Sequence, residues 1–325
     1  MEKRKLGESD LLVAPITFGG NVFGWTIDEA KSFEILDGFL EAGFNFIDTA
    51  DSYSRWKPGN QGGESETIIG NWVKSRNNRE QVIIATKVGS DMGIGKGLSK
   101  KYIAQAVEGS LKRLNTDYID LYQSHYDDPE TPMEETLQAF DELIKAGKVR
   151  WIGASNFTPE RLLASLECSK KNGFARYQTL QPEYNLYSRQ EFEENLEPIC
   201  VANHLGVINY YALASGFLSG KYRSEADLSK SQRGGGIKNY LNDRGLNILA
   251  ALDQVAAKYN TKPATVALAW LIARPSVTAP IASVTSMEQL ADLTQAASLN
   301  LDREAISILN DASSWRFAEG KLTAE

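Results

Sequence analysis

Short apolar runs that end in polar turns alternate along this chain with segments of helical periodicity. Such a run is typical of a buried parallel strand whose carboxyl end opens into a loop. The predicted strands cover residues 11–16, 44–48, 81–87, 118–125, 149–156, 177–181, 206–211 and 278–282. The segments between them repeat apolar residues every three or four positions, and several end at a glycine. They predict helices at residues 27–42, 65–75, 99–114, 132–146, 190–203, 244–258, 263–273, 286–297 and 302–313, with another that starts near Thr158.

The order of these elements predicts an α/β fold, a single (β/α)8 TIM barrel. Strand and helix alternate eight times without a repeat or a break in composition, which suits a barrel of this size. A doubly wound sheet is less favoured, because no G-x-G-x-x-G motif follows the first strand. A polar stretch at about 219–242 interrupts the pattern, and a loop of that length inside a compact fold is usually functional.

Composition narrows the classes of function. Hydrophobic residues make up 42% of the chain and charged residues 24%, as in an ordinary soluble protein. Lys and Arg total 35 against 42 Asp and Glu, and the resulting charge of −7 disfavours nucleic acid and anionic membranes as partners. No apolar run is long enough to span a membrane, and no signal-peptide core follows the N-terminus. The two cysteines, Cys168 and Cys200, predict neither a disulfide framework nor a zinc site, and a cytoplasmic location is expected.

Four chemically useful residues follow three successive predicted strands. Asp48 and Tyr53 follow the second strand, Lys87 ends the third, and His125 ends the fourth. In a parallel barrel the catalytic residues gather at these carboxyl ends. We therefore expect the four side chains to form one acid–base centre.

The chemistry of this centre would be built on the tyrosine. An unperturbed phenol has a pKa near 10, and a neighbouring ammonium such as Lys87 would lower the pKa of Tyr53. Asp48 could hold the lysine charged, while a neutral His125 could orient a substrate oxygen. Such a centre suits carbonyl reduction, with the proton supplied by the protein and the hydride by a nicotinamide cofactor. A purely structural Asp–Lys pair and a core histidine are the alternatives for the individual residues.

The segments that carry these residues resemble the signatures of the aldo-keto reductase family. The match is closest to a bacterial branch that also resembles potassium-channel β-subunits. Similar segments lie at residues 46–53, 63–66, 86–87, 120–125, 153–156, 181–185 and 216–222, and the resemblance runs from about residue 6 to residue 309. It implies one barrel domain over residues 1–325 that reversibly reduces small aldehydes or ketones. By the same resemblance Tyr53 is the general acid, Asp48 and Lys87 tune it, and His125 orients the carbonyl.

The resemblance also implies a cofactor, NADP(H), with NAD(H) as the alternative. Ser155, Asn156 and Gln181 match residues that hold the nicotinamide carboxamide, and Tyr210 matches the aromatic residue that stacks on its ring. Lys221 matches a cation beside the pyrophosphate, where it offers a point charge. The full set of matched positions is Gly20, Asn21, Asp48, Ser155, Asn156, Gln181, Tyr210, Tyr211, Leu213, Ser215, Gly216, Lys221, Ser283, Thr285, Gln289 and Asp292.

Three positions depart from the family's pattern. Tyr211 replaces a serine that commonly contacts the cofactor, and Leu293 replaces an asparagine that commonly touches adenine. Thr285 replaces the arginine that commonly grips the 2′-phosphate, so this segment gives no basis for a strict preference for NADP over NAD. A positive charge could instead come from the adjoining loop, which carries Arg233, Lys238 and Arg244.

Other interpretations remain open at this point. A cofactor-sensing regulatory or binding protein of the same fold would keep the cofactor site but turn over slowly. A metal-dependent barrel enzyme is less favoured, because only His125 of the two histidines ends a strand. Trp56 stands close to Tyr53 in the sequence and could form a wall of the substrate pocket or part of an exposed loop.

Overall fold

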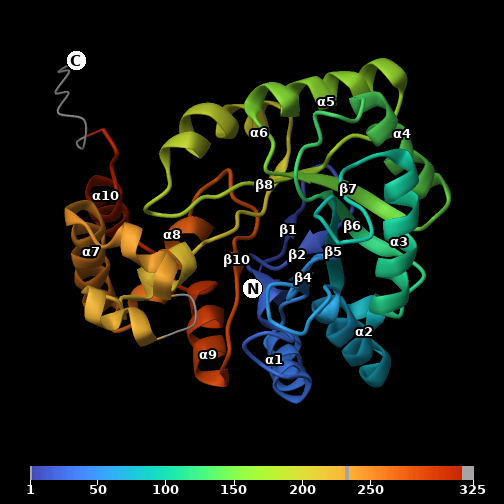
Figure 1. Cartoon of the computed structure of the whole chain (residues 1–325). Coiled ribbons are helices and arrows are strands. Elements are labelled where there is room, and N and C mark those ends of the chain that lie inside the picture. Colours follow the sequence, from blue (N-terminus) through green and yellow to red (C-terminus); the bar gives the residue numbers. More distant parts are fainter. Residues whose placement is uncertain (1, 231–233, 317–325) are drawn as a thin grey trace.

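Eight parallel strands form one closed sheet in the computed structural model, which describes residues 2–230 and 234–316 (Figure 1). Their order around the sheet is β10-β3-β4-β5-β6-β7-β8-β9. Backbone N–H groups of Thr278 and Ile281 donate to Val207 O and Asn209 O, at 2.8 and 2.9 Å, and close the barrel. The strands are β3 (Thr17–Gly19), β4 (Phe46–Asp48), β5 (Ile83–Val88), β6 (Ile119–Ser124), β7 (Val149–Ser155), β8 (Thr179–Gln181), β9 (Gly206–Val207) and β10 (Ile281–Ala282). The predicted (β/α)8 barrel is confirmed.

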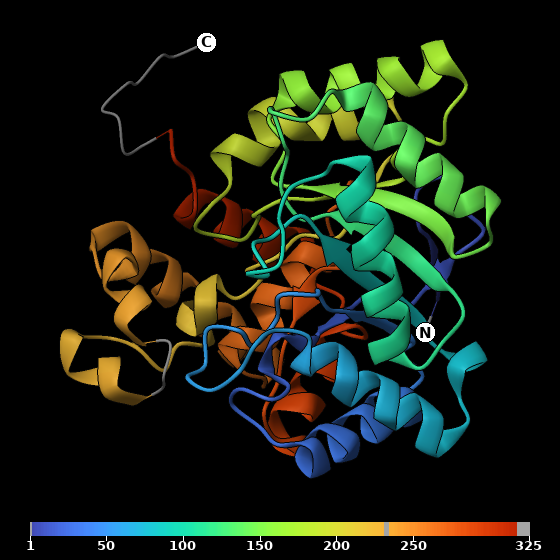
Figure 2. The same cartoon turned by 45° about the vertical axis from the view of Figure 1, so that its right-hand side comes forward.

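Helices surround the strands, and several begin at side chains that cap them (Figure 2). The side chains of Asp28, Ser99 and Thr158 accept from backbone N–H groups in the first turns of α1, α3 and α5. No helix within residues 2–230 and 234–316 is long and apolar enough to cross a membrane. The helices are α1 (Glu29–Glu41), α2 (Glu64–Arg76), α3 (Lys100–Leu114), α4 (Met133–Lys145), α5 (Pro159–Asn172), α6 (Glu197–Ala202), α7 (Asp243–Tyr259), α8 (Pro263–Ile272), α9 (Met287–Ala296) and α10 (Arg303–Ala312).

A short antiparallel hairpin of β1 (Arg4–Lys5) and β2 (Leu12–Val13) precedes the barrel. The buried side chains of Leu6, Leu11 and Val13 pack with barrel residues in one apolar cluster. The hairpin therefore covers the end of the barrel opposite the carboxyl ends of the strands. The prediction that residues 11–16 form the first barrel strand is wrong, because that strand, β3, begins at Thr17.

The register of the sheet brings the polar strand ends to one level. Gly19 pairs with Asp48 across β3 and β4, and Lys87 of β5 pairs with Gln123 of β6. Ser155 of β7 likewise pairs with Gln181 of β8. Because all neighbours are parallel, these residues open onto the same face of the barrel.

One predicted helix is divided in the structure. The segment predicted as a single helix at 190–203 consists of a π-helical stretch, η3 (Phe192–Leu196), followed by α6. Pro198 explains the change, because its nitrogen carries no hydrogen for the carbonyl four residues earlier.

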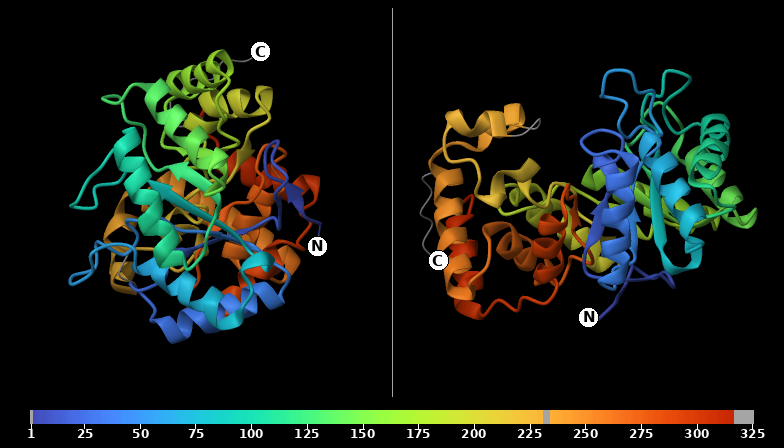
Figure 3. Two further views of the ribbon diagram at one scale, coloured as in Figure 1. Left: turned by 90° about the vertical axis from the view of Figure 1, so that its right-hand side faces the viewer. Right: turned by 90° about the horizontal axis from the view of Figure 1, so that it is seen from below.

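The polar stretch at about 219–242 is not an irregular loop throughout. It follows η4 (Ala214–Ser219) and contains two further short 3-10 helices, η5 (Glu225–Lys230) and η6 (Gly234–Tyr240). Figures 1 and 3 place this segment and α7 on the side of the barrel opposite α3. Residues 231–233, with the candidate cation Arg233, lie outside the described residues.

Replacing Gly70 by alanine should destabilise the fold, since α2 and α3 touch at this glycine. A Cβ at Gly70 would lie 2.1 Å from the carbonyl oxygen of Arg113, and rigid backbone cannot move aside cheaply. We expect Gly70→Ala to lower the free energy of unfolding in urea by about 2 kcal/mol or more. Gly109→Ala in α3 is the matched control. Its Cβ would meet only the guanidinium of Arg113, at 3.0 Å, so it should be neutral or stabilising. Equal effects at both sites would contradict the close approach.

Candidate active site

A buried lysine lies at the centre of the polar strand ends. Lys87 Nζ donates to Asp48 Oδ2 at 2.5 Å, to the carbonyl oxygen of Thr49 at 2.8 Å and to the hydroxyl oxygen of Tyr53 at 2.8 Å. The lysine side chain is 0% exposed and that of Asp48 is 1% exposed. An ammonium has three protons, so all three have acceptors.

The carboxylate of Asp48 is held from a second side. Its Oδ1 accepts from Gln123 Nε2 at 3.0 Å and from Gln181 Nε2 at 2.9 Å. The two glutamines come from β6 and β8, while Asp48 ends β4. Side chains from two strands, together with Lys87 from β5, therefore fix the orientation of this carboxylate. Gln123 has no place among the sequence-predicted site residues.

Burial determines the protonation state of the tyrosine. It raises the pKa of Tyr53 well above the ordinary value near 10, and the Asp48 carboxylate raises it further. This direction is opposite to that expected from a neighbouring ammonium alone, and the phenol therefore carries its proton at neutral pH. Burial also lowers the pKa of Lys87, while the Asp48 carboxylate opposes that shift.

His125 lies beside the tyrosine, with ring centroids 5.9 Å apart. Its Nδ1 is 2.9 Å from the hydroxyl oxygen of Ser90, and the ring of Tyr126 stacks on it at 4.8 Å. Burial lowers the pKa of His125 well below 6.5, and the positive charge of Lys87 lowers it further. The imidazole is therefore neutral at physiological pH.

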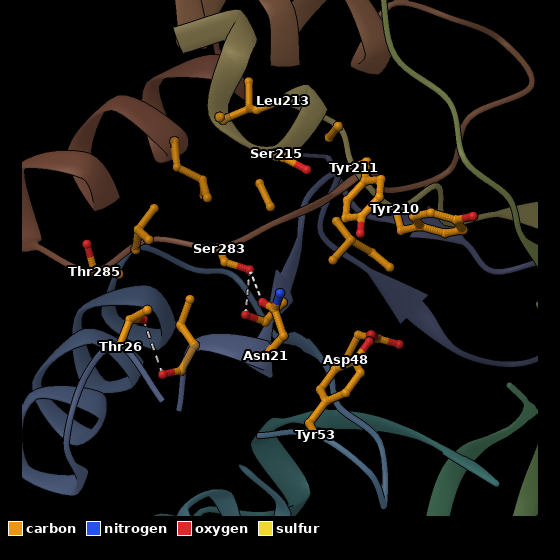
Figure 4. A pocket seen from close by; sticks show the side chains of 18 of the residues that line it. Asn21, Thr26, Asp48, Tyr53, Tyr210, Tyr211, Leu213, Ser215, Ser283 and Thr285 are labelled. Carbon is orange, nitrogen blue, oxygen red and sulfur yellow. Dashed lines mark hydrogen bonds between the residues drawn. The ribbon is translucent and has the colours of Figure 1, made fainter. Parts of the chain in front are cut away.

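A cavity of about 1200 Å³ opens above these groups (Figure 4). Of the sequence-predicted residues, Gly20 and Lys87 do not line it; Lys87 contacts the hydroxyl of Tyr53, which does. The predicted residues that do line it are Asn21, Asp48, Tyr53, Trp56, His125, Ser155, Asn156, Gln181, Tyr210, Tyr211, Leu213, Ser215, Gly216, Lys221, Ser283, Thr285, Gln289 and Asp292. The structure thus brings predicted residues from seven strand ends into one continuous space.

Amide and hydroxyl groups at the ends of β7 and β8 are linked to one another. Asn156 Nδ2 donates to the carbonyl oxygen of His125 at 2.8 Å, and Asn156 Oδ1 accepts from the hydroxyl of Tyr210 at 3.0 Å. Ser155 Oγ donates to the carbonyl oxygen of Gln181 at 2.8 Å. Asn156 has a φ of 56°, a left-handed conformation that asparagine tolerates better than most residues. This backbone conformation holds the amide against the rim of the cavity.

The turn after β9 contains a cluster of left-handed residues. Tyr211, Ala214, Ser215 and Gly216 have φ values of 54°, 47°, 57° and 99°. A bulky residue such as tyrosine rarely takes this conformation, and strain of this kind concentrates at ligand sites. Figure 4 shows Tyr211 directed into the cavity toward Asp48 and Tyr53. A Cβ at Gly216 would lie 3.8 Å from Lys221 Nζ, so the lysine lies against this turn.

The end of β10 supplies neutral polar groups. Ser283 Oγ lies 2.7 Å from both Gly19 O and Asn21 Oδ1 (Figure 4). The backbone N–H of Thr285 donates to Gln289 Oε1 at 2.9 Å. This contact folds the glutamine back onto the turn that precedes α9.

Two of the residues proposed to replace the family's arginine, Lys238 and Arg244, lie away from the cavity. Lys238 pairs with Glu225 at 3.2 Å, and Arg244 donates to the carbonyl oxygens of Tyr187 and Ser313. Neither residue lines the cavity. The sequence interpretation that they could supply a positive charge to the cofactor is therefore not supported for these two.

Several cavity residues were missed by sequence reasoning. Ser90, Tyr126 and Lys262 all line the cavity. Tyr126 directly follows His125, which was a usable signal, whereas Lys262 lies on the N-terminal side of α8, far from any strand end. Trp56, for which two interpretations were open, lines the cavity, and its ring meets that of Tyr53 edge to face at 5.8 Å.

The comparison with known proteins agrees with this architecture. A model of the Aldo/keto reductase family matches residues 15–314. The chain belongs to the aldo/keto reductase family. It is 38% identical to the uncharacterized oxidoreductase YrpG of Bacillus subtilis, over 96% of this chain and 95% of the relative.

Two further relatives of this aldo/keto reductase differ in their described roles. The aldo-keto reductase AFTS1 of Alternaria alternata is 32% identical over 95% of this chain and 91% of its own length. A probable voltage-gated potassium channel subunit beta of Oryza sativa subsp. japonica is 30% identical over 90% of each chain. The predicted family is confirmed, and the protein is an oxidoreductase of that family. Among residues 2–230 and 234–316, no three His, Cys, Asp or Glu side chains converge in a way that could hold a metal ion.

The neutral histidine should make the stability of this aldo/keto reductase depend on pH. In the unfolded chain His125 binds a proton below about pH 6.5, while in the folded protein it stays neutral to a lower pH. The unfolded state therefore holds more protons in that window, and stability falls as the pH falls. Between about pH 7.5 and 5.5, the wild type should lose about 1 kcal/mol more unfolding free energy than His125→Gln. Urea unfolding at both pH values measures this difference, and parallel losses in the two proteins would refute it.

Proposed function

We propose that this aldo/keto reductase reduces aldehydes or ketones to alcohols, reversibly, with NADP(H) or NAD(H) as the cofactor. The observation that carries the proposal is the hydrogen bond from Lys87 Nζ to the hydroxyl oxygen of Tyr53. Because the phenol oxygen accepts from the lysine, its own proton is available for a group in the cavity. That arrangement suits an acid that protonates a developing alkoxide.

Tyr53 transfers its proton to the carbonyl oxygen of the substrate as negative charge develops there. The hydride comes from the reduced nicotinamide when the cofactor is bound. The tyrosinate that remains lies 2.8 Å from the ammonium of Lys87, which stabilises the new negative charge. Lys87 keeps its proton throughout, since Asp48 and the carbonyl oxygen of Thr49 hold the other two N–H groups.

His125 orients the carbonyl. In the tautomer whose Nδ1 accepts from the hydroxyl of Ser90, the ring proton resides on Nε2, which can donate to the same substrate oxygen. A neutral imidazole serves this purpose because it adds a hydrogen bond without placing a second cation beside Lys87. Trp56 and Tyr126 flank Tyr53 and His125 and form the walls against which the substrate packs.

The donor set of the cavity fits a nicotinamide dinucleotide. Hydroxyl and amide groups of Ser155, Asn156 and Gln181 suit a carboxamide, which both donates and accepts hydrogen bonds. The left-handed turn at Ser215 and Gly216, with Lys221 against it, suits a pyrophosphate. Both sets line one continuous cavity with Tyr53, which hydride transfer to the same substrate requires.

A regulatory role is the second candidate. It draws on the likeness to a probable potassium channel subunit beta, which is 30% identical to this chain. Under this alternative the protein would bind the cofactor and a partner protein but turn over every carbonyl slowly. The connected Asp48, Lys87 and Tyr53 favour the enzyme, since binding alone requires no proton donor.

Removing the hydroxyl of Tyr53 should abolish reduction without abolishing cofactor binding. We expect Tyr53→Phe to lower kcat by about 10²-fold to 10⁴-fold, the usual contribution of a general acid, while the Kd for the cofactor changes little. NADPH and NADH consumption with a panel of small aldehydes and ketones measures the first quantity, and fluorescence titration measures the second.

Tyr118→Phe is the matched control for this experiment. Tyr118 directly precedes β6 at the opposite end of the barrel, where its ring packs under Arg79, so the same loss of a hydroxyl should leave kcat unchanged. Full activity in Tyr53→Phe would show that another group supplies the proton. Cofactor binding without turnover by the wild type would favour the regulatory role.

A further inference from the structure

The cavity has a second end, remote from the catalytic tyrosine. It continues past Ser215 and Lys221 to α8 and α9, where its lining is Lys262, Ala264, Leu268, Thr285, Gln289, Asp292 and Leu293. Figure 4 shows Thr285 on one side of the cavity, with Tyr210 and Tyr211 on the other. A dinucleotide whose nicotinamide lies beside Tyr53 has this space left for its adenosine. The apolar side chains of Leu268 and Leu293 suit the faces of an adenine ring.

The basic group at this end is already occupied by acidic partners. Of the seven described residues just named at the adenosine end, Lys262 alone has a basic side chain. Its Nζ pairs with Glu288 Oε1 at 2.7 Å and with Asp292 Oδ2 at 2.9 Å. These carboxylates raise the pKa of Lys262, so the ammonium is charged. One positive and two negative charges leave this cluster with a net charge of −1.

The start of α9 does not offset this charge. A helix N-terminus is commonly an anion site, because its first N–H groups are unpaired. Here the N–H of Thr285 donates to Gln289 Oε1 at 2.9 Å, and the N–H of Gln289 donates to Ser286 Oγ at 3.2 Å. Glu288 adds a carboxylate in the first turn of the helix. Two N–H groups of this turn are therefore already engaged, and Glu288 places a like charge near a phosphate bound there.

We propose that Glu288 and Asp292 make this adenosine end select a ribose 2′-hydroxyl over a 2′-phosphate, so that the protein prefers NAD(H) to NADP(H). The residues present do not fit the 2′-phosphate of NADP(H). Even when Lys262 turns toward that phosphate, the carboxylate of Asp292 remains in the cavity lining, and that of Glu288 remains close to Lys262, near a group that carries up to two negative charges. A carboxylate at this place can instead accept a hydrogen bond from a ribose hydroxyl. The inference rests on the proposed function.

Equilibrium binding tests the inference without any substrate. Quenching of tryptophan fluorescence, with Trp56 in the cavity wall, gives dissociation constants for NADH and NADPH with the full-length protein. We expect the wild type to bind NADH about tenfold more tightly than NADPH, a ratio that corresponds to a modest electrostatic difference. Competition by 5′-AMP and by adenosine 2′,5′-bisphosphate should show the same order. Because the charges are exposed, added salt should narrow the ratio.

Neutralising the two carboxylates should abolish the preference for NADH over NADPH. Glu288→Gln and Asp292→Asn, singly and together, keep the shape of the side chains and remove the repulsion. We expect the double variant to bind NADPH about tenfold more tightly than the wild type, with the NADH constant nearly unchanged. Glu304→Gln is the matched control, since Glu304 also pairs with a lysine, Lys258 at 2.7 Å, but neither member of that pair lines the cavity.

The outcomes separate the inference from the function on which it rests. Tighter binding of NADPH than of NADH by the wild type would overturn the inference and leave the proposed reductase intact. A ratio that is the same in the wild type, the double variant and Glu304→Gln would also overturn it. Failure of both dinucleotides to bind would overturn the proposed function and the inference together.

Discussion

The site depends on a buried ammonium whose three protons all have acceptors. Burying an unpaired charge is costly, and Lys87 is tolerated because Asp48, the carbonyl of Thr49 and Tyr53 surround it. The contacts that pair the three protons of the Lys87 ammonium also fix the position of the Tyr53 hydroxyl, since the phenol oxygen is the third acceptor. Under the proposed function, the proton of Tyr53 then serves a substrate in the cavity. Stability of the interior and the proposed role of the tyrosine would follow from the same set of contacts.

The barrel supplies this geometry through its register. β4, β5, β6 and β8 each contribute one side chain to the network around Asp48, and parallel pairing places these strand ends at one level. Gln123 and Gln181 hold the second oxygen of the carboxylate, so Asp48 cannot rotate away from Lys87 without losing two hydrogen bonds. The positions of Asp48 and Lys87 thus follow from the closed sheet.

The two ends of the cavity use charge in different ways. Around Lys87 the charges are buried, so their effect depends on direct contact and is weakly screened by salt. Around Lys262 the side chains are largely exposed, and isolated pairs of that kind contribute little to stability. Such a cluster can instead change the relative binding affinities of ligands that differ in charge. Under the two proposals, proton transfer and cofactor choice would lie at separate places along one cavity.

The sequence by itself determined the alternation of strands and helices and the four residues at the strand ends, Asp48, Tyr53, Lys87 and His125. These features are local, because strand periodicity and the position of a residue at a strand end are set by its neighbours along the chain. Only the tertiary structure decided which side chains form hydrogen bonds and ion pairs with these and other site residues. Gln123 meets Asp48 across 75 residues, and the lysine that meets Asp292 lies 30 residues away on another helix. It also decided the direction of the pKa shift of Tyr53, because burial depends on closure of the whole barrel.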